Sequence, residues 1–124
     1  MSADTQRLGE LGERVAERWL EQQGWRVVVR RFRSGHRDID LVAERLGTVV
    51  FIEVKTRRGE RFGDPVEAVH WRKRRELIRS ANVWIDRFGR GGETYRFDVI
   101  GVLITGERVR IRHVTNAFAA PSET

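Results

Sequence analysis

The sequence predicts a single α/β domain with the element order αβββαββ, in which helices flank a mixed central sheet. Two observations indicate this class: helical apolar periodicity in two long segments, and five β-branched or apolar runs of strand length. A third is a connection of four residues between the second and third runs, which is short enough to require an antiparallel hairpin. With 124 residues the chain is long enough to bury one core.

The first helix is predicted over residues 4–23. Asp4 can cap its start, and Gly24 stands where a left-handed residue ends a helix. Its apolar positions recur at helical spacing and are Leu8, Leu11, Val15 and Trp19, with Ala16 and Leu20 widening the stripe.

Three strands follow, over residues 25–32, 38–43 and 48–56. Ser34 and Gly35 provide the first turn, and residues 44–47 provide the hairpin connection. The loop after the third strand, residues 57–63, is rich in arginine.

The second helix is predicted to begin at Asp64, with Pro65 in its first turn and Glu67 completing a capping box. Its apolar stripe continues to Phe88, with a kink or break expected near residues 70–73.

Two strands complete the domain. Residues 97–104 are apolar on both faces, as in the middle of a sheet. In residues 108–114, apolar positions alternate with arginines, which predicts one apolar face and one basic face. We expect one domain over residues 1–118 and a disordered tail over 119–124.

Composition narrows the class of protein. Hydrophobic residues make up 40% and charged residues 34%, the balance of a folded chain rather than a disordered one. No apolar run can span a bilayer and no secretory signal is evident, so we expect a cytoplasmic protein without membrane contact. Without cysteine, and with three scattered histidines, the sequence offers neither disulfides nor a zinc site.

The formal net charge of +6 favours a polyanionic partner such as nucleic acid. Of 24 basic residues only two are lysine, Lys55 and Lys73. A lysine places a compact ammonium group beside a reacting oxygen, whereas arginine presents a broad fork. The two lysines are therefore candidates for a specific role, although chance survival under an arginine bias would leave the same pattern.

Alternate residues of a strand share a face. Glu53 therefore lies beside Lys55 on the third strand, and Asp38 beside Asp40 on the second. Charged residues inside so apolar a strand as residues 49–55 are costly unless they are paired. This pattern indicates a site rather than an ordinary solvated surface.

The register of the hairpin decides whether the acids meet. A tight turn at residues 46–47 sets Arg45 opposite Thr48 and Asp40 opposite Glu53. Opposed Cβ atoms lie about 4.5–5.5 Å apart, so that both carboxylates can reach one Mg²⁺. A shift of one residue would separate them. The alternative is a solvated face on which the acids and Lys55 form loose ion pairs.

These motifs resemble a known superfamily. Residues 38–42 (Asp-Ile-Asp-Leu-Val) and 50–57 (Val-Phe-Ile-Glu-Val-Lys-Thr-Arg) resemble the core of PD-(D/E)XK nucleases. More closely, the chain resembles the uncharacterised bacterial YraN-like family, itself similar to archaeal Holliday-junction resolvases. The likeness extends over nearly the whole chain and includes Gly12-Glu13 with Ala16, Phe62-Gly63, Lys73 with Leu77 and Ala81, residues 96–99, and Ala117-Phe118.

The sequence departs from the usual pattern of that resemblance in two ways. Arg37-Asp38 replaces Gly-Glu, which leaves the role of Asp38 open, and Ile39 stands where the superfamily name has proline. The resemblance implies a restriction-endonuclease-like sandwich.

The resemblance also implies roles for the site residues. Asp40 and Glu53 would bind one or two Mg²⁺ or Mn²⁺ ions, with the carbonyl of Val54 as a further ligand. Lys55 would position the attacking water or offset negative charge. Glu13 would be an outer-shell ligand, or else an exposed glutamate at the helix edge.

The basic segments are expected to bind the substrate. Lys73 would reach a phosphate near the site, or else keep its head in water over the core. Among the four tryptophans, Trp71 is the one placed for base stacking. The arginines predicted to bind the nucleic-acid backbone are Arg57, Arg58, Arg61, Arg72, Arg74 and Arg75.

Three functions fit this sequence. The first is a metal-dependent endonuclease that hydrolyses DNA, with branched or structured DNA as the substrate implied by the resolvase resemblance. The second is a non-catalytic nucleic-acid-binding module that retains the fold, and its partner could be DNA or RNA. The third is a protein-interaction domain whose acids balance its arginines. Resolvase-like folds often act as dimers, so a homodimer is an expectation, although no segment of the sequence marks an interface.

Overall fold

The computed structural model of the protein describes residues 3–35, 37–61 and 70–118. The predicted tail, and the predicted helix start at Asp64, Pro65 and Glu67, lie outside these residues. The elements, in chain order, are α1 (Ala3–Gln22), β1 (Arg26–Ser34), β2 (Arg37–Arg45), β3 (Thr48–Arg58), α2 (Trp71–Phe88), β4 (Thr94–Thr105) and β5 (Arg108–Phe118).

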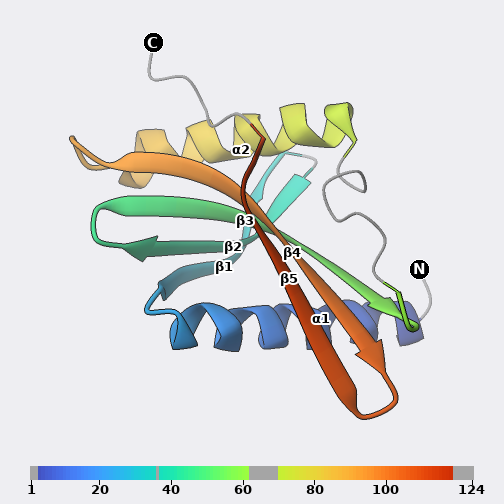
Figure 1. Ribbon diagram of the computed structural model, residues 1–124. Coiled ribbons are helices and arrows are strands. Elements are labelled where there is room, and N and C mark those ends of the chain that lie inside the picture. The colour runs from blue at the N-terminus through green and yellow to red at the C-terminus, as the bar shows by residue number, and fades with distance from the viewer. Residues whose placement is uncertain (1–2, 36, 62–69, 119–124) are drawn as a thin grey trace.

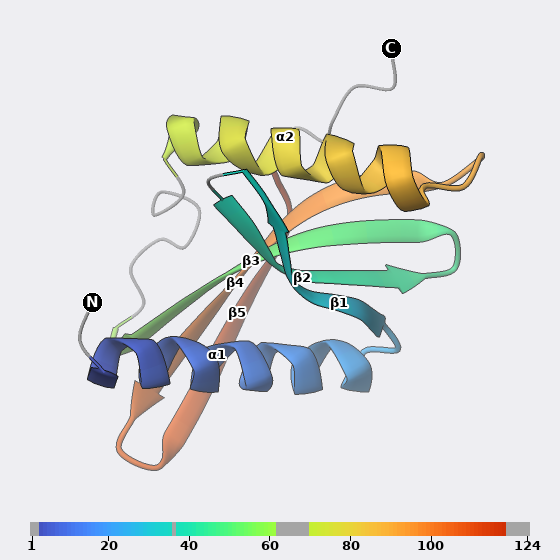
Figure 2. The same cartoon turned by 180° about the vertical axis from the view of Figure 1, so that it is seen from behind.

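The five strands form one mixed sheet in the order β1-β2-β3-β4-β5. Neighbouring strands are antiparallel except β3 and β4, which are parallel. The chain passes through α2 between these two strands, and Figures 1 and 2 show α1 and α2 on opposite faces of the sheet. The predicted class and element order are therefore confirmed.

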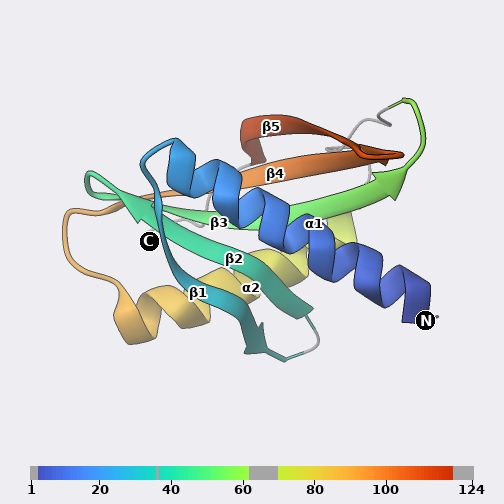
Figure 3. The same cartoon turned by 90° about the horizontal axis from the view of Figure 1, so that it is seen from below.

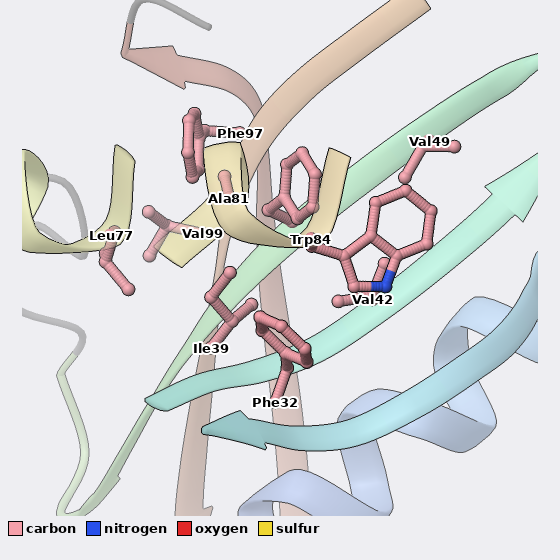
Figure 4. Close-up of a cluster of buried hydrophobic side chains, with 10 residues drawn as sticks. Phe32, Ile39, Val42, Val49, Leu77, Ala81, Trp84, Phe97 and Val99 are labelled. Carbon is pink, nitrogen blue, oxygen red and sulfur yellow. The ribbon is translucent and has the colours of Figure 1, made fainter. Parts of the chain in front are cut away.

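Each face of the sheet has its own core. β3 supplies both, because Val49 and Phe51 face α2 whereas Val50 and Ile52 face α1. The cluster beneath α2, drawn in Figure 4, consists of Phe32, Ile39, Val42, Val49, Phe51, Leu77, Ala81, Trp84, Phe97 and Val99. Burial on both faces explains why β3 and β4 read as continuous apolar runs.

The predicted hairpin between β2 and β3 is present. Arg45 pairs with Thr48, and Leu46 and Gly47 form the turn with φ angles of 49° and 80°. Two successive left-handed residues make the tight turn whose twist suits antiparallel strands. The register on which the site prediction depends is therefore set at this turn.

α1 lies close against the sheet, as Figure 3 shows. A Cβ built on Gly12 would come within 1.7 Å of Thr56 Oγ1, so only glycine fits at this contact. Gly24 has φ of 90° and ends the helical segment as predicted. The prediction that Asp4 caps the helix is wrong, because Asp4 lies within the first turn.

The His70 side chain marks the start of α2. His70 has extended backbone angles, and its Nδ1 accepts a hydrogen bond of 3.3 Å from the N–H of Arg72. The helix therefore starts at Trp71, within the interval where a break was expected. The expected break near residues 70–73 is therefore present, and the His70 side chain provides the N-cap acceptor for the helix that follows it.

β5 is an edge strand, and only part of its predicted apolar face is covered. Ile111 packs against the core beneath α1, whereas Val109 is 46% exposed. Val109 pairs with Ile104 next to the β4–β5 turn, and Figure 1 shows this hairpin extending past α1. In the described part of the chain, neither helix has the length and apolar character of a membrane span.

Candidate active site

Asp40 and Glu53 lie where the pairing between β2 and β3 ends. The paired register of these strands ends at Leu41 opposite Ile52, so Asp40 and Glu53 are the next residues in line. Instead of continuing the ladder, Asp40 Oδ2 accepts a hydrogen bond of 2.7 Å from the N–H of Val54. Figure 3 shows the two strands diverging at this end. The structure thus brings Asp40 against β3, as the sequence predicted.

The alternation predicted for β2 breaks at the same place. Ile39 and Val42 both pack beneath α2, whereas Leu41 packs beneath α1. Strict alternation would put Ile39 and Leu41 on one face. The prediction that Asp38 and Asp40 share a regular strand face is therefore wrong. Asp38 instead forms an ion pair of 3.3 Å with Arg33.

Asp40 is half-buried beside a second carboxylate. Burial and the negative charge of Glu53 raise the pKa of Asp40 from 3.8 to about 8. The charge of Glu13 and a hydrogen bond with Glu53 act in the same direction, and the hydrogen bond from Val54 acts against it. A cation between these carboxylates would relieve their repulsion.

Glu53 is only 5% exposed and is surrounded by ammonium groups. Lys55 Nζ lies 3.5 Å from Glu53 Oε1, and Lys73 Nζ contacts the same oxygen from α2. Burial, and then the hydrogen bond and charge repulsion of Lys73, lower the pKa of Lys55. The two lysines of the chain therefore meet at one carboxylate.

Glu13 reaches the site region from α1 and is bound by Arg31. The Nε and Nη2 atoms of Arg31 lie 3.0 and 3.1 Å from the two carboxylate oxygens of Glu13. Arg31 has φ of 50°, a strained value for a residue with a side chain. It lies opposite Asp40 in the β1–β2 register, between the pairs Arg30–Leu41 and Phe32–Ile39. The sequence carries no signal for this backbone conformation.

The donor set suits a hard divalent ion held by few protein ligands. No group of three or more histidine, aspartate or glutamate side chains with metal-binding geometry occurs within residues 3–35, 37–61 and 70–118. The donors are instead the adjacent carboxylates of Asp40 and Glu53. Mg²⁺ commonly binds one or two carboxylates and keeps several waters, so the pair fits such an ion. Lys73 already neutralises part of the negative charge of Glu53, so its ammonium group would have to move away from Glu53 when an ion binds.

Arginines gather at the end of β3. In the sheet, Arg58 lies beside Ile104 of β4, and Ile104 lies beside Val109 of β5. Figure 1 shows the end of β3 and the β4–β5 turn at the same end of the molecule. We use the term basic edge for the exposed arginines of this region, which are Arg57, Arg58, Arg61, Arg108, Arg110 and Arg112. The last three were not predicted, because they lie about 50 residues from the first three in sequence.

The arginines of α2 contact aromatic rings. The guanidinium carbons of Arg72 and Arg75 lie 5.4 and 5.9 Å from the centroid of Trp71. That of Arg74 lies 5.4 Å from the Phe118 ring. Arg72 and Arg75 are exposed, whereas Arg74 is half-buried.

A buried polar network on the α1 face was missed by the sequence reasoning. Asp98 is fully buried and is held by Arg96 through two hydrogen bonds of 2.8 Å, by His113 Nε2 at 2.7 Å and by the Asn116 N–H at 2.9 Å. Trp19 Nε1 donates to His113 Nδ1 at 3.1 Å, which leaves the proton of neutral His113 on Nε2, facing Asp98. An acid inside an apolar strand was the available signal.

The pKa of Asp98 shows how completely this network is satisfied. Burial would raise that pKa, but the hydrogen bonds from His113 and Arg96 hold it below its ordinary value. Such a network specifies how α1, β4 and β5 pack.

The element order and the sheet are consistent with a restriction-endonuclease-like fold. The chain belongs to the uncharacterised protein family UPF0102, which it matches over residues 12–102. This is the YraN-like family that the motifs predicted, so that prediction is confirmed.

Relatives match this chain over nearly its whole length. A UPF0102 protein of Symbiobacterium thermophilum is 45% identical over 119 residues, which are 94% of this chain and 99% of the relative. Another, of Alkaliphilus metalliredigens, is 41% identical over 111 residues, which are 90% and 96% of the two chains. The similarity therefore includes both helices and all five strands.

Proposed function

We propose that the protein is a metal-dependent nuclease that hydrolyses DNA phosphodiester bonds at the site formed by Asp40, Glu53 and Lys55. The observation that carries this proposal is the meeting of both lysines of an arginine-rich chain at Glu53, beside Asp40. Two carboxylates and two ammonium groups in one partly buried place are costly for stability, which favours a functional reason for keeping them.

In this proposal Asp40 and Glu53 hold Mg²⁺ or Mn²⁺, with the Val54 carbonyl as a further ligand. The ion would acidify the attacking water and offset the negative charge of the transition state. The N–H of Val54, which binds Asp40 Oδ2, fixes the orientation of that carboxylate.

The lysines take separate parts in the proposed reaction. Lys55 lies on β3 with Glu53 and is suited to orient the water or to stabilise charge on the reacting phosphate. Its lowered pKa follows from burial beside Lys73. Lys73 comes from α2 and would turn from Glu53 to a substrate phosphate when a metal ion takes its place.

A second function is favoured by one observation. Glu53 is already neutralised by two ammonium groups, so its buried charge is satisfied without a metal ion. A nucleic-acid-binding module that keeps the fold but does not cleave would retain such a cluster.

A DNA-cleavage assay distinguishes the nuclease from the non-catalytic binding module. End-labelled linear, flapped and four-way DNA is incubated with the protein and Mg²⁺ or Mn²⁺. We expect cleavage by the wild type. The cleavage rate of Glu53→Gln should be lower by a factor of about 100 or more. Asp86→Asn, which removes an exposed carboxylate near the C-terminal end of α2, is the matched control and should cleave like the wild type.

Circular dichroism establishes that each variant is folded. Cleavage of no substrate, or equal cleavage by Glu53→Gln, would favour the binding module. Branched DNA as the preferred substrate would appear as faster cleavage of the four-way or flapped DNA.

A further inference from the structure

Trp71 is an exposed indole at the first position of α2. It is 54% exposed, whereas Trp84 is 5% exposed and both Trp19 and Trp25 pack against the core beneath α1. Large apolar side chains at the surface lose the benefit of burial. Among the tryptophans, Trp71 is thus the one whose ring is available to a ligand.

Two cations accompany this ring. The guanidinium groups of Arg72 and Arg75 lie 5.4 and 5.9 Å from its centroid, and the His70 ring lies 5.7 Å away. A nucleobase that stacks on the indole would replace one guanidinium contact. The released arginine could then bind the adjacent phosphate, since arginine binds phosphate oxygens in a bidentate manner.

Trp71 lies on the first turn of α2, as does Lys73, which contacts the candidate active site. Lys73, two residues further along α2, places its Nζ at Glu53. Residues two apart on a helix point about 200° apart, so the indole and the ammonium group flank the helix start on different sides. The two groups are thus separated by roughly the 10–12 Å width of a helix. A strand with one phosphate at Glu53 that crosses the start of α2 would span this width in a few nucleotides. A paired base is stacked inside its duplex and cannot present a face to the indole.

We infer that Trp71, with Arg72 and Arg75, is a stacking platform for an unpaired base, and that the substrate of this site has a single-stranded segment. This inference rests on the proposed function, because it assigns the substrate class of that site. The charge of the platform suits a polyanion, and the stacking surface suits a base of any sequence.

The test measures binding without cleavage. Anisotropy is recorded in EDTA for a labelled oligodeoxythymidine of about 12 nucleotides, and for a blunt duplex of the same length. We expect the wild type to bind the single strand more tightly than the duplex. Trp71→Ala should weaken single-strand binding between about 5-fold and about 150-fold and leave duplex binding within about 2-fold. Trp71→Phe should restore most of the lost affinity.

Phe88→Ala is the matched control. Phe88 is also 54% exposed and lies at the other end of α2, away from the site. We expect it to bind both DNAs like the wild type, with thermal melting showing that all variants are folded. Equal single-strand binding by Trp71→Ala and the wild type, or no single-strand preference in the wild type, would overturn the inference. Because no metal is present, these results do not depend on whether the protein cleaves DNA.

Discussion

At the scale of single residues, the chemistry of the site follows from burial and charge. Burial, and then the negative charge of the nearby Glu53, raise the pKa of Asp40 to about 8. Glu53 keeps its charge balanced by Lys55 and Lys73. Among the described residues no lysine contacts Asp40, and its carboxylate is instead bound by the N–H of Val54.

The raised pKa of Asp40 predicts how stability depends on pH. Without metal, the folded protein keeps a proton that the unfolded chain releases above about 3.8. The folded state therefore binds more protons between that value and about 8, and the stability contributed by Asp40 is lost as pH rises through this window. Urea denaturation in EDTA across this range should show the loss in the wild type.

Asp40→Asn provides the control, because the amide does not titrate. It should lack this part of the pH dependence while retaining the rest. If Asp40 binds a metal ion as proposed, the ion would have to displace the same proton, so the rise in Tm produced by Mn²⁺ should increase from about pH 6 to about pH 8 in the wild type. The idea fails if Asp40→Asn and the wild type have the same pH dependence and the same Mn²⁺ response.

At the scale of elements, the site exists because paired strands stop pairing. β2 and β3 begin as a tight hairpin at Leu46–Gly47 and separate after Leu41 and Ile52. The Asp40 side chain then takes an acceptor position that a ladder carbonyl would otherwise hold. On the other side of β2, Arg31 adopts its left-handed conformation opposite Asp40. The parting of β2 and β3 thus coincides with a backbone irregularity in β1.

The packing of α1 on β3 is tested by two glycines of the same helix. Gly12→Ala should destabilise the protein by about 1–3 kcal/mol, because its Cβ would overlap Thr56. Gly9→Ala should stabilise it by about 0.5–1 kcal/mol, since nothing lies within 4 Å of that Cβ and alanine favours a helix. Chemical denaturation of both variants provides the comparison.

We expect the changes in the free energy of unfolding caused by Gly12→Ala and Gly9→Ala to have opposite signs. Two stabilising changes would mean that α1 does not approach β3 as closely as the structure shows. Because Glu13 follows Gly12 directly, Gly12→Ala is also expected to disturb the contact between Glu13 and Arg31.

At the scale of the whole molecule, charge is distributed unevenly around the sheet. Arginines from β3 and β5, distant in sequence, form the basic edge at one end. The Arg110 guanidinium also donates a hydrogen bond of 2.5 Å to the Glu60 carbonyl, which joins β5 to the segment after β3. This arrangement suits a polyanion that runs along one end of the sheet.

The salt dependence of nucleic-acid binding tests whether the basic edge contacts phosphates. If Arg57 and Arg58 each bind a phosphate, Arg57→Gln and Arg58→Gln should each reduce the slope of log K against log salt by about 1. Arg87→Gln, an equal change of charge in the last turn of α2, should leave the slope unchanged. Equal slopes for all three variants and the wild type would place the nucleic acid elsewhere.

Much of the fold was predictable because its signals are local. The hairpin follows from a short connection, β4 from a run that is apolar on both faces, and the end of α1 from Gly24. The N-cap of α2 was not predicted, because His70 caps the helix with its side chain and apolar periodicity does not report such a contact. The prediction of an apolar face on residues 108–114 was wrong at Val109, because the exposure of a side chain depends on whether another layer covers the strand.

The sequence by itself determined the element order, the hairpin register that sets Arg45 opposite Thr48 and brings Asp40 against β3, and the presence of two exceptional lysines, because these depend on residue spacing and turn length. Only the tertiary structure decided that Lys73 reaches Glu53, that Arg31 binds Glu13, and that Asp98 and His113 form a buried network. These contacts join segments brought together by the sheet and the two helices that cover it. Their energies depend on burial and distance, which no spacing along the chain specifies.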